Sequence, residues 1–235
     1  MKIRIQNNLI KMFNAPLLAS LTVGLGALNV SATPNLILNG SFESGNYSEN
    51  SFVPTRMQLN NGSTTIDNWV VGATSGNFWW VGPPNNAQDG FFSVDLDSNG
   101  HAPTYIEQTF STTVGFQYIV TASFSSEGNG GPAVTGVSID GNLLGTATTG
   151  AGIGEAGPAY LDLIWTTQSF LFTATAATST LRFQDATETT QFYNPLIDNV
   201  SVVETVPEQS SALGLAGIAL LGGIGFRRKL NQSLR

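Results

Sequence analysis

The sequence predicts an all-β protein whose main part is a single β-sandwich of jelly-roll type. Ten short segments with strand-like patterning are separated by turns rich in Gly, Asn and Ser. No amphipathic helical repeat of useful length occurs between the two apolar ends of the chain. Charged residues make up only 11% of the 235 residues, and short polar side chains fill their place, as is common in exported β proteins.

We expect three parts along the chain: a signal peptide over residues 1–32, a β-sandwich over 33–205, and a C-terminal hydrophobic sorting segment over 206–235. The middle part is long enough to bury a sizeable core in one domain. No internal repeat and no second globular domain is apparent, so the two ends are interpreted as targeting segments.

The N-terminal segment has the order of parts expected of a signal peptide. Three basic residues lie within the first eleven positions, and an apolar run follows over residues 15–27. Val30-Ser31-Ala32 supplies small residues of the kind that a signal peptidase recognises. We therefore predict cleavage between Ala32 and Thr33, with a retained membrane anchor as the alternative.

The predicted strands follow from alternation of apolar and polar residues between turn signals. Residues 116–124 give the clearest pattern, with Phe116 and every second residue after it expected on one buried face. Asp140-Gly141-Asn142 predicts a tight hairpin, whereas 44–65 and 145–157 are expected to be loops. The full set of predicted strands is 35–43, 66–71, 78–81, 91–96, 105–110, 116–124, 134–140, 168–174, 180–184 and 196–204.

The charges are segregated along the chain. Of the nine Lys and Arg residues, seven lie in the two end segments, which leaves only Arg56 and Arg182 for the region between. Fifteen of the sixteen acidic residues lie in 33–206, so that region carries about 2 − 15 = −13 charges. Nucleic-acid binding requires clustered cations to neutralise phosphates, and this composition excludes it.

The inventory of reactive side chains argues against an enzyme. There is no cysteine, so disulfides, thiolate catalysis and Cys-ligated zinc are excluded. The single histidine, His101, lies in a polar loop, and no serine stands in a Gly-x-Ser-x-Gly motif. A glycosidase with two carboxylates is the remaining enzymatic alternative, but no pair stands out. We therefore expect a protein without catalytic activity.

The C-terminal segment combines Val206-Pro207-Glu208, an apolar run of 16 residues over 211–226, and the basic cluster Arg227-Arg228-Lys229. At about 1.5 Å per residue, this run falls short of a ~30 Å hydrocarbon core. The positive-inside rule would keep the basic cluster in the cytoplasm. A simple transmembrane tail anchor is one interpretation.

In order, spacing and terminal position, this segment resembles the PEP-CTERM sorting signal of bacteria. The resemblance implies recognition and removal by an exosortase, in species that usually make exopolysaccharide. The second proline of that signal is Gln209 here, a departure that bears on processing by the expected enzyme. The sorting residues implied are Val206, Pro207, Glu208, Arg227 and Arg228.

The body of the chain also resembles a known family. The motifs are Asn35-Leu36-Ile37-Leu38-Asn39-Gly40-Ser41-Phe42-Glu43, Asp89-Gly90-Phe91-Phe92-Ser93-Val94-Asp95-Leu96, Ile106-Glu107-Gln108-Thr109-Phe110 and Pro195-Leu196-Ile197-Asp198-Asn199-Val200-Ser201-Val202. They are similar to the bacterial choice-of-anchor C family and to related plant cell-wall proteins of unknown function. The resemblance implies a galactose-binding-like jelly roll and a role facing carbohydrate.

The same resemblance implies a structural calcium ion held by Glu43 and Asp198, where the first and last strands of such jelly rolls lie side by side. A physical argument points the same way. Asp198 shares its strand phase with Leu196 and Val200, and a carboxylate that faces a core needs a partner. A hard cation with oxygen ligands is one such partner. Hydrogen bonds to backbone amides, or a position at the sheet rim, are equally good alternatives.

Aromatic side chains are the candidates for stacking on sugar rings. Trp69, Trp79, Trp80 and Tyr193 are the residues we expect at a ligand platform, with Trp165 a further candidate. Each tryptophan, taken singly, is more often a core residue. Because neighbouring residues of a strand face opposite ways, at most one of Trp79 and Trp80 is expected in the core.

Together these features predict a non-catalytic protein exported across the inner membrane. The tail would hold it there in transient membrane contact, before an exosortase-type enzyme processes it and the protein enters the cell envelope or extracellular matrix. Its jelly roll would bind extracellular polysaccharide. The alternative of another class is a structural matrix or biofilm component that self-associates without a specific ligand. A carbohydrate-active enzyme is the weakest of the three.

Overall fold

The computed structural model describes residues 33–49, 55–73, 78–96, 104–127, 132–150, 163–187 and 194–205. The predicted signal peptide, the sorting segment, His101 and Tyr193 lie outside these residues. In the described part of the chain, no helix is long and apolar enough to cross a membrane.

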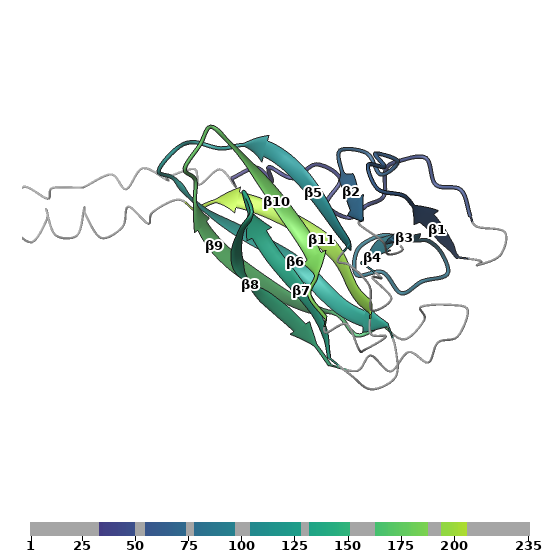
Figure 1. Ribbon diagram of the computed structural model, residues 1–235. Helices are drawn as coiled ribbons and strands as arrows, with labels where there is room; N and C mark the ends of the chain where they lie inside the picture. Colours follow the sequence, from purple (N-terminus) through teal and green to yellow (C-terminus); the bar gives the residue numbers. More distant parts are fainter. Residues whose placement is uncertain are drawn as a thin grey trace, which may run out of the picture. The chain divides into compact units, whose positions relative to one another are not determined.

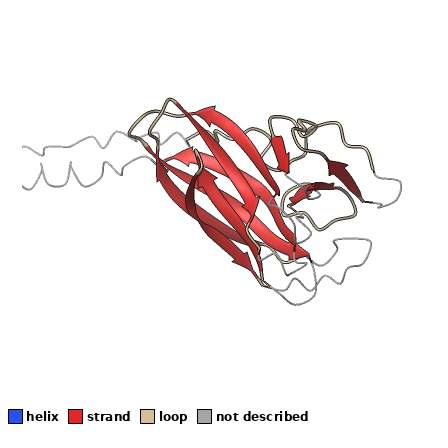
Figure 2. Cartoon of the chain, in the orientation of Figure 1, coloured by secondary structure: helices blue, strands red, loops and turns tan. Residues whose placement is uncertain are grey.

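The described residues contain eleven strands, which form two antiparallel sheets (Figures 1 and 2). In spatial order, the six-stranded sheet consists of β1 (Arg56–Leu59), β3 (Phe78–Val81), β4 (Ser93–Asp95), β11 (Asn194–Glu204), β6 (Gln117–Glu127) and β9 (Thr166–Thr173). The five-stranded sheet consists of β2 (Val70–Ala73), β5 (Thr104–Ser111), β10 (Thr178–Asp185), β7 (Ala133–Ile139) and β8 (Asn142–Thr149).

The chain passes repeatedly between the sheets, so that strands adjacent in sequence are seldom neighbours. From β4 to β7, each strand lies in the sheet opposite to its predecessor, and β9, β10 and β11 alternate in the same way. Crossing connections of this kind are typical of sandwich folds. The prediction of an all-β sandwich is confirmed.

The main core lies between the two sheets and is rich in aromatic residues. Trp80, Phe124 and Ile197 contribute from the six-stranded sheet, and Ile106 and Phe183 from the five-stranded sheet, each with at most 1% of its surface exposed. Burying one such side chain contributes about 1.5–3 kcal/mol. A chain without cysteine can hold its fold with a core of this size.

The first predicted strand, 35–43, is not a strand, although it is fixed against β11. The Leu36 amide donates to the Val202 carbonyl at 2.8 Å. The Asn35 side chain accepts from the Val202 amide at 2.9 Å. Asn39 and Phe42 have φ values of 52° and 59°, which interrupt an extended chain. This pairing brings the beginning of the domain to the end of its last strand.

The sequence interpretation was also wrong in two loops, at one strand end and for the predicted strand 66–71, which overlaps β2 only at its last two residues. β1 lies inside the predicted loop 44–65, and β8 extends into the predicted loop 145–157. Phe116 precedes β6 and is 48% exposed, whereas Tyr118 and Phe124 are buried as predicted. The hairpin between β7 and β8 is confirmed, with positive φ at both Asp140 and Gly141, as a two-residue turn requires.

Candidate functional site

Part of the outer face of the six-stranded sheet is covered by the protein's own chain. Trp79, Val81 and Leu196 form a second buried cluster there with Leu163, and Trp165 packs against it. Trp165 also donates its indole N–H to the Asn86 carbonyl at 2.7 Å. Trp79 and Trp80 do face opposite ways, but both are buried because both faces of the six-stranded sheet are covered at this point.

The tryptophans predicted to bind a ligand are core residues. Trp69 and Trp80 are each 1% exposed and Trp79 is 8% exposed. Their indole nitrogens serve the fold, since Trp69 donates to the Asn39 carbonyl at 2.9 Å and Trp80 to the Phe42 carbonyl at 3.1 Å. The prediction of a sugar platform on Trp69, Trp79 and Trp80 is therefore wrong, because no ring face is free to stack. The fourth candidate, Tyr193, lies outside the described residues.

The outer face of the five-stranded sheet carries a different aromatic group. Strand alternation points Tyr105 and Glu107 of β5 outward, together with Arg182 and Gln184 of β10, and all four are half-buried. The pairing of β5 with β10 sets Tyr105 opposite Gln184 and Glu107 opposite Arg182. We call these four residues the Tyr105 platform.

The Tyr105 ring lies over the backbone of the neighbouring strand. Gly72 of β2 is its cross-strand partner, and a Cβ at Gly72 would overlap the ring carbons of Tyr105. The Arg182 guanidinium carbon lies 3.9 Å from the centre of the same ring, a cation–π contact. The missing side chain of Gly72 therefore lets the ring settle onto the sheet beneath a cation.

An ion pair fixes the guanidinium on the ring. Arg182 Nη2 lies 2.7 Å from Glu107 Oε2, and Arg182 Nε donates to the same oxygen at 2.8 Å. Beside this pair, the hydroxyls of Thr109 and Thr180 are 2.8 Å apart. The platform thus joins an aromatic ring to donors and acceptors held in fixed positions. Such a combination suits a neutral ligand with many hydroxyl groups.

The two predicted calcium ligands both hold the loop that leads into β4. Asp198 is fully buried, and its Oδ2 accepts from the amides of Gln88 and Asp89 at 2.7 and 2.9 Å. Its Oδ1 accepts from the Asn199 amide at 2.6 Å. Asp198 is therefore buried, but it lies on the outer face of its sheet with Leu196 and meets backbone amides of the covering loop. The strand phase misled the prediction, because a register shift between Asp198 and Ser201 turns Val200 and Val202 toward the main core.

Glu43 holds the other half of the same loop. Its Oε1 accepts from the amides of Phe91 and Phe92, both at 2.8 Å. Gly90 lies between these amides and those held by Asp198. Its φ of 74° favours glycine, and a Cβ added at this position would overlap the Glu43 carboxylate. The first segment and last strand of the domain thus clamp one loop from two sides. We call this arrangement the carboxylate clamp.

Burial dominates the electrostatics of the clamp at Asp198. Removal from water raises the pKa of its carboxyl from 3.8 to about 7. The amides of Asp89, Asn199 and Gln88 act to lower this pKa, and the charge of Asp89 acts to raise it. Glu43, in contrast, is exposed to solvent.

Calcium binding at Glu43 and Asp198 stays a prediction. Among the described residues, no group of three or more His, Cys, Asp or Glu side chains is placed to hold a metal ion. Backbone N–H groups also donate to Glu43 Oε1 and to both oxygens of Asp198, and these bonds compete with a cation for the same oxygen atoms. If the ion is bound, the melting temperature of the chain will rise when calcium replaces a chelator. Equal melting temperatures, with Glu43→Gln as the comparison variant, would contradict it.

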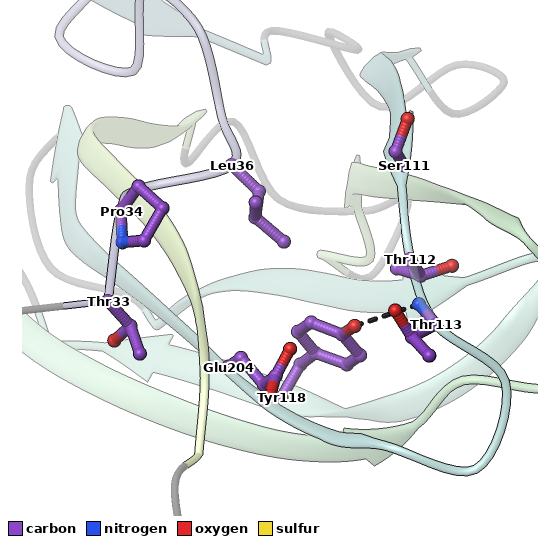
Figure 3. A pocket seen from close by; sticks show the side chains of 8 residues that line it. All are labelled: Thr33, Pro34, Leu36, Ser111, Thr112, Thr113, Tyr118 and Glu204. Carbon is purple, nitrogen blue, oxygen red and sulfur yellow. Dashed lines mark hydrogen bonds between the residues drawn. The ribbon is translucent and has the colours of Figure 1, made fainter.

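A pocket of about 240 Å³ lies where the domain begins and ends, as Figure 3 shows. Its polar groups are short hydroxyls and the Glu204 carboxylate, and the Tyr118 hydroxyl accepts from the Thr113 amide at 2.9 Å. It is lined by Thr33, Pro34, Leu36, Ser111, Thr112, Thr113, Tyr118 and Glu204. The pocket lies between the first residues of the domain and the turn between β5 and β6.

Comparison with known proteins identifies one family and distant structural relatives. A family model described as a protein of unknown function (DUF642) matches residues 35–203. Halomucin from Haloquadratum walsbyi is 34% identical over 177 residues, which are 73% of this chain and 2% of halomucin.

Two carbohydrate-binding modules are among the solved structures that this chain resembles. A family 35 module from Clostridium thermocellum shares 11% identity at a TM-score of 0.42, over 63% of this chain and 96% of the module. The CBM22-1 xylan-binding domain of Xyn10C from Paenibacillus barcinonensis also shares 11% identity, at a TM-score of 0.43, over 65% of this chain and 94% of that domain.

Proposed function

The chain belongs to the DUF642 family of proteins of unknown function, and we propose that its β-sandwich binds polysaccharide through the Tyr105 platform. The ligand is a chain of neutral sugars that lies across β5 and β10. Its hydroxyls bond to Glu107, Arg182 and Gln184, and its C–H groups pack on the outer plane of the guanidinium and the edge of the Tyr105 ring.

One observation carries this proposal: the flat seating of Tyr105 between Gly72 and Arg182. The arrangement is built from three strands and leaves the outer edges of an aromatic ring and an ion pair half-exposed on a sheet face. Gly72 and Arg182 cover the two faces of the ring, so the flat surface open to the C–H groups of a sugar is the outer plane of the guanidinium together with the edge of the ring. The acidic character of the domain favours neutral over anionic sugars, because like charges repel.

The same proposal includes export and sorting. The signal peptide with cleavage between Ala32 and Thr33, and the tail with its Val206-Pro207-Glu208 motif, support a route across the inner membrane. An exosortase-type enzyme is the expected processing partner. The polysaccharide-binding domain would then act at the cell envelope or in the extracellular matrix, without catalysis.

Replacing Tyr105 with Ala is expected to weaken polysaccharide binding at least tenfold, because the ring that holds the Arg182 guanidinium flat on the sheet is lost. Tyr105→Phe should bind nearly as well as the wild type, since the ring remains. Binding of the chain to immobilised neutral polysaccharides and to a glycan array measures both effects. Thr121→Ala is the matched control, because Thr121 stands on the outer face of the other sheet, paired with Ser169 through hydroxyls 3.0 Å apart.

Two results would contradict the proposal. One is uniformly negative binding of the wild type across neutral polysaccharides. The other is equal affinity of Tyr105→Ala, Thr121→Ala and the wild type, which would place any binding site elsewhere on the domain. Circular dichroism of each variant separates loss of binding from loss of folding.

A further inference from the structure

The edges of the two sheets differ sharply between the two sides of the sandwich. On one side, β1 and β2 are edge strands of four residues each. On the other side, β8 and β9 are edge strands of eight residues each. An edge strand presents unpaired N–H and C=O groups, and a long edge is a template for another strand.

β9 is the more regular of the two long edges. It pairs with β6 without interruption over all eight residues, from Thr166 opposite Phe124 to Thr173 opposite Gln117. The pairing of β8 with β7, in contrast, shifts register at Val137 and Ser138, and such a bulge twists an edge away from further pairing. Figure 1 shows β9 at the rim of the sandwich, and in the described residues it pairs with β6 alone.

The composition of β9 also lacks the features that protect edges. Its sequence, TTQSFLFT, has no charged residue and no proline, two of the means by which natural edge strands avoid pairing. Leu171 projects from its outer face with 56% of its surface exposed. Thr, Phe and Leu are residues that pair well across strands.

The charge of the domain limits where two copies can meet. Residues 33–206 carry about 2 − 15 = −13 charges, so most contacts between two copies would bring like charges together. In a symmetric antiparallel pair, residues of β9 meet residues of the same strand. Because β9 is uncharged throughout, a contact between two β9 strands avoids this repulsion over eight residues. The other regularly paired edge strands of the described residues, β1 and β2, have only four residues each.

We propose that two copies of this chain associate through antiparallel pairing of their β9 strands. The contact joins two six-stranded sheets into one sheet of 6 + 6 = 12 strands, with the two Leu171 side chains on the same face. It would also unite two Tyr105 platforms in one particle, a consequence that depends on the proposed function. The pairing itself does not depend on it.

The absence of cysteine from the sequence makes the pairing measurable by single-cysteine cross-linking of the full chain in mild detergent. Ser169→Cys, Leu171→Cys and Thr173→Cys place a thiol along the outer face of β9. Thr109→Cys, on the exposed outer face of the five-stranded sheet, is the control and retains the same terminal segments. After mild oxidation, denaturing gels report the fraction of disulfide-linked dimer.

We expect one β9 position to give at least tenfold more dimer than Thr109→Cys, with the yield falling at positions farther from it, because a two-fold axis brings only one position close to its own copy. Leu171→Lys should shift wild-type dimers to monomers in sedimentation, whereas Thr109→Lys should not. Yields on β9 equal to the control, or unchanged sedimentation of Leu171→Lys, would overturn the pairing. So would disulfide adducts of β9 with other proteins in place of the second copy. Polysaccharide binding by a monomeric protein would leave the proposed function intact while excluding this dimer.

Discussion

Raising the pH from about 4 to about 8 is expected to lower the free energy of unfolding by about 4 kcal/mol through Asp198 alone. Burial raises the pKa of this carboxyl from 3.8 to about 7, so between these values the folded state holds a proton that the unfolded state has released. Stability from this group is therefore greatest at low pH and is lost as the pH rises through about 7. Above that pH, the folded protein must keep a charge in a site without solvent.

Urea unfolding followed by tryptophan fluorescence measures this effect, since Trp69, Trp79 and Trp80 are buried and change environment on unfolding. Asp198→Asn keeps one acceptor oxygen for the amides of the loop but does not titrate. The difference in unfolding free energy between the wild type and this variant should therefore change by about 4 kcal/mol across the range. Asp67→Asn, which removes an exposed carboxylate, is the control for the loss of one charge. Parallel curves for the wild type and Asp198→Asn would show that Asp198 is not the titrating group.

Adding one methyl group at Gly72 is expected to destabilise the domain by about 1–3 kcal/mol, the usual effect of forcing atoms into a filled site. The new Cβ would overlap the ring of Tyr105, and the ring would have to leave the platform. Polysaccharide binding should fall as far as it does in Tyr105→Ala. The Gly72→Ala variant therefore tests the seating of the ring without removing any polar group of the site.

The double variant that combines Gly72→Ala with Tyr105→Ala tests this prediction most directly. Once Tyr105 is Ala, the space above Gly72 is empty, and Gly72→Ala should be neutral or stabilising by a few tenths to about 1 kcal/mol, because glycine weakens strands. Gly136→Ala is the matched control in the same transverse row of the sheet, where the nearest atom to a new Cβ is Leu143 Cδ1 at 3.6 Å. Thermal unfolding of the four proteins gives the coupling energy. Additive effects of Gly72→Ala and Tyr105→Ala would mean that the ring does not rest on Gly72.

Local patterning predicted most of the fold. Strand β3 coincides with the predicted segment, and β5, β6, β7, β9, β10 and β11 differ from their predictions by at most three residues at either end. Most of these strands have one face more buried than the other, so their alternation is visible in the sequence. β3 is buried on both faces and is visible as a short apolar run between turn signals. β1 and β8 escaped prediction because they are edge strands with weak alternation: in β8, Leu143 is exposed and Gly145 packs near Phe170.

The Tyr105 platform could not be predicted in the same way, because it depends on the register between paired strands. Tyr105 and Arg182 are far apart in sequence, and only the pairing of β5 with β10 brings them into contact. One signal was available: Arg182 is one of two cations in an acidic domain and lies in a predicted strand. The prediction from the tryptophans was wrong because the number of aromatic rings in a sequence does not show whether the rings are exposed on a sheet or buried. At Trp79 and Trp80, both faces of the sheet are covered.

The pairing of the first segment with the last strand has a mechanical consequence. Leu36 bonds to Val202, so the domain is entered and left at one end, and tension applied at Thr205 enters the fold through β11. That strand is central, hydrogen-bonded to β4 on one side and to β6 on the other. Its ladder bonds lie across the direction of pull and share the load in shear. A domain pulled from this end while its five-stranded face holds a polymer would transmit force along the central strand β11.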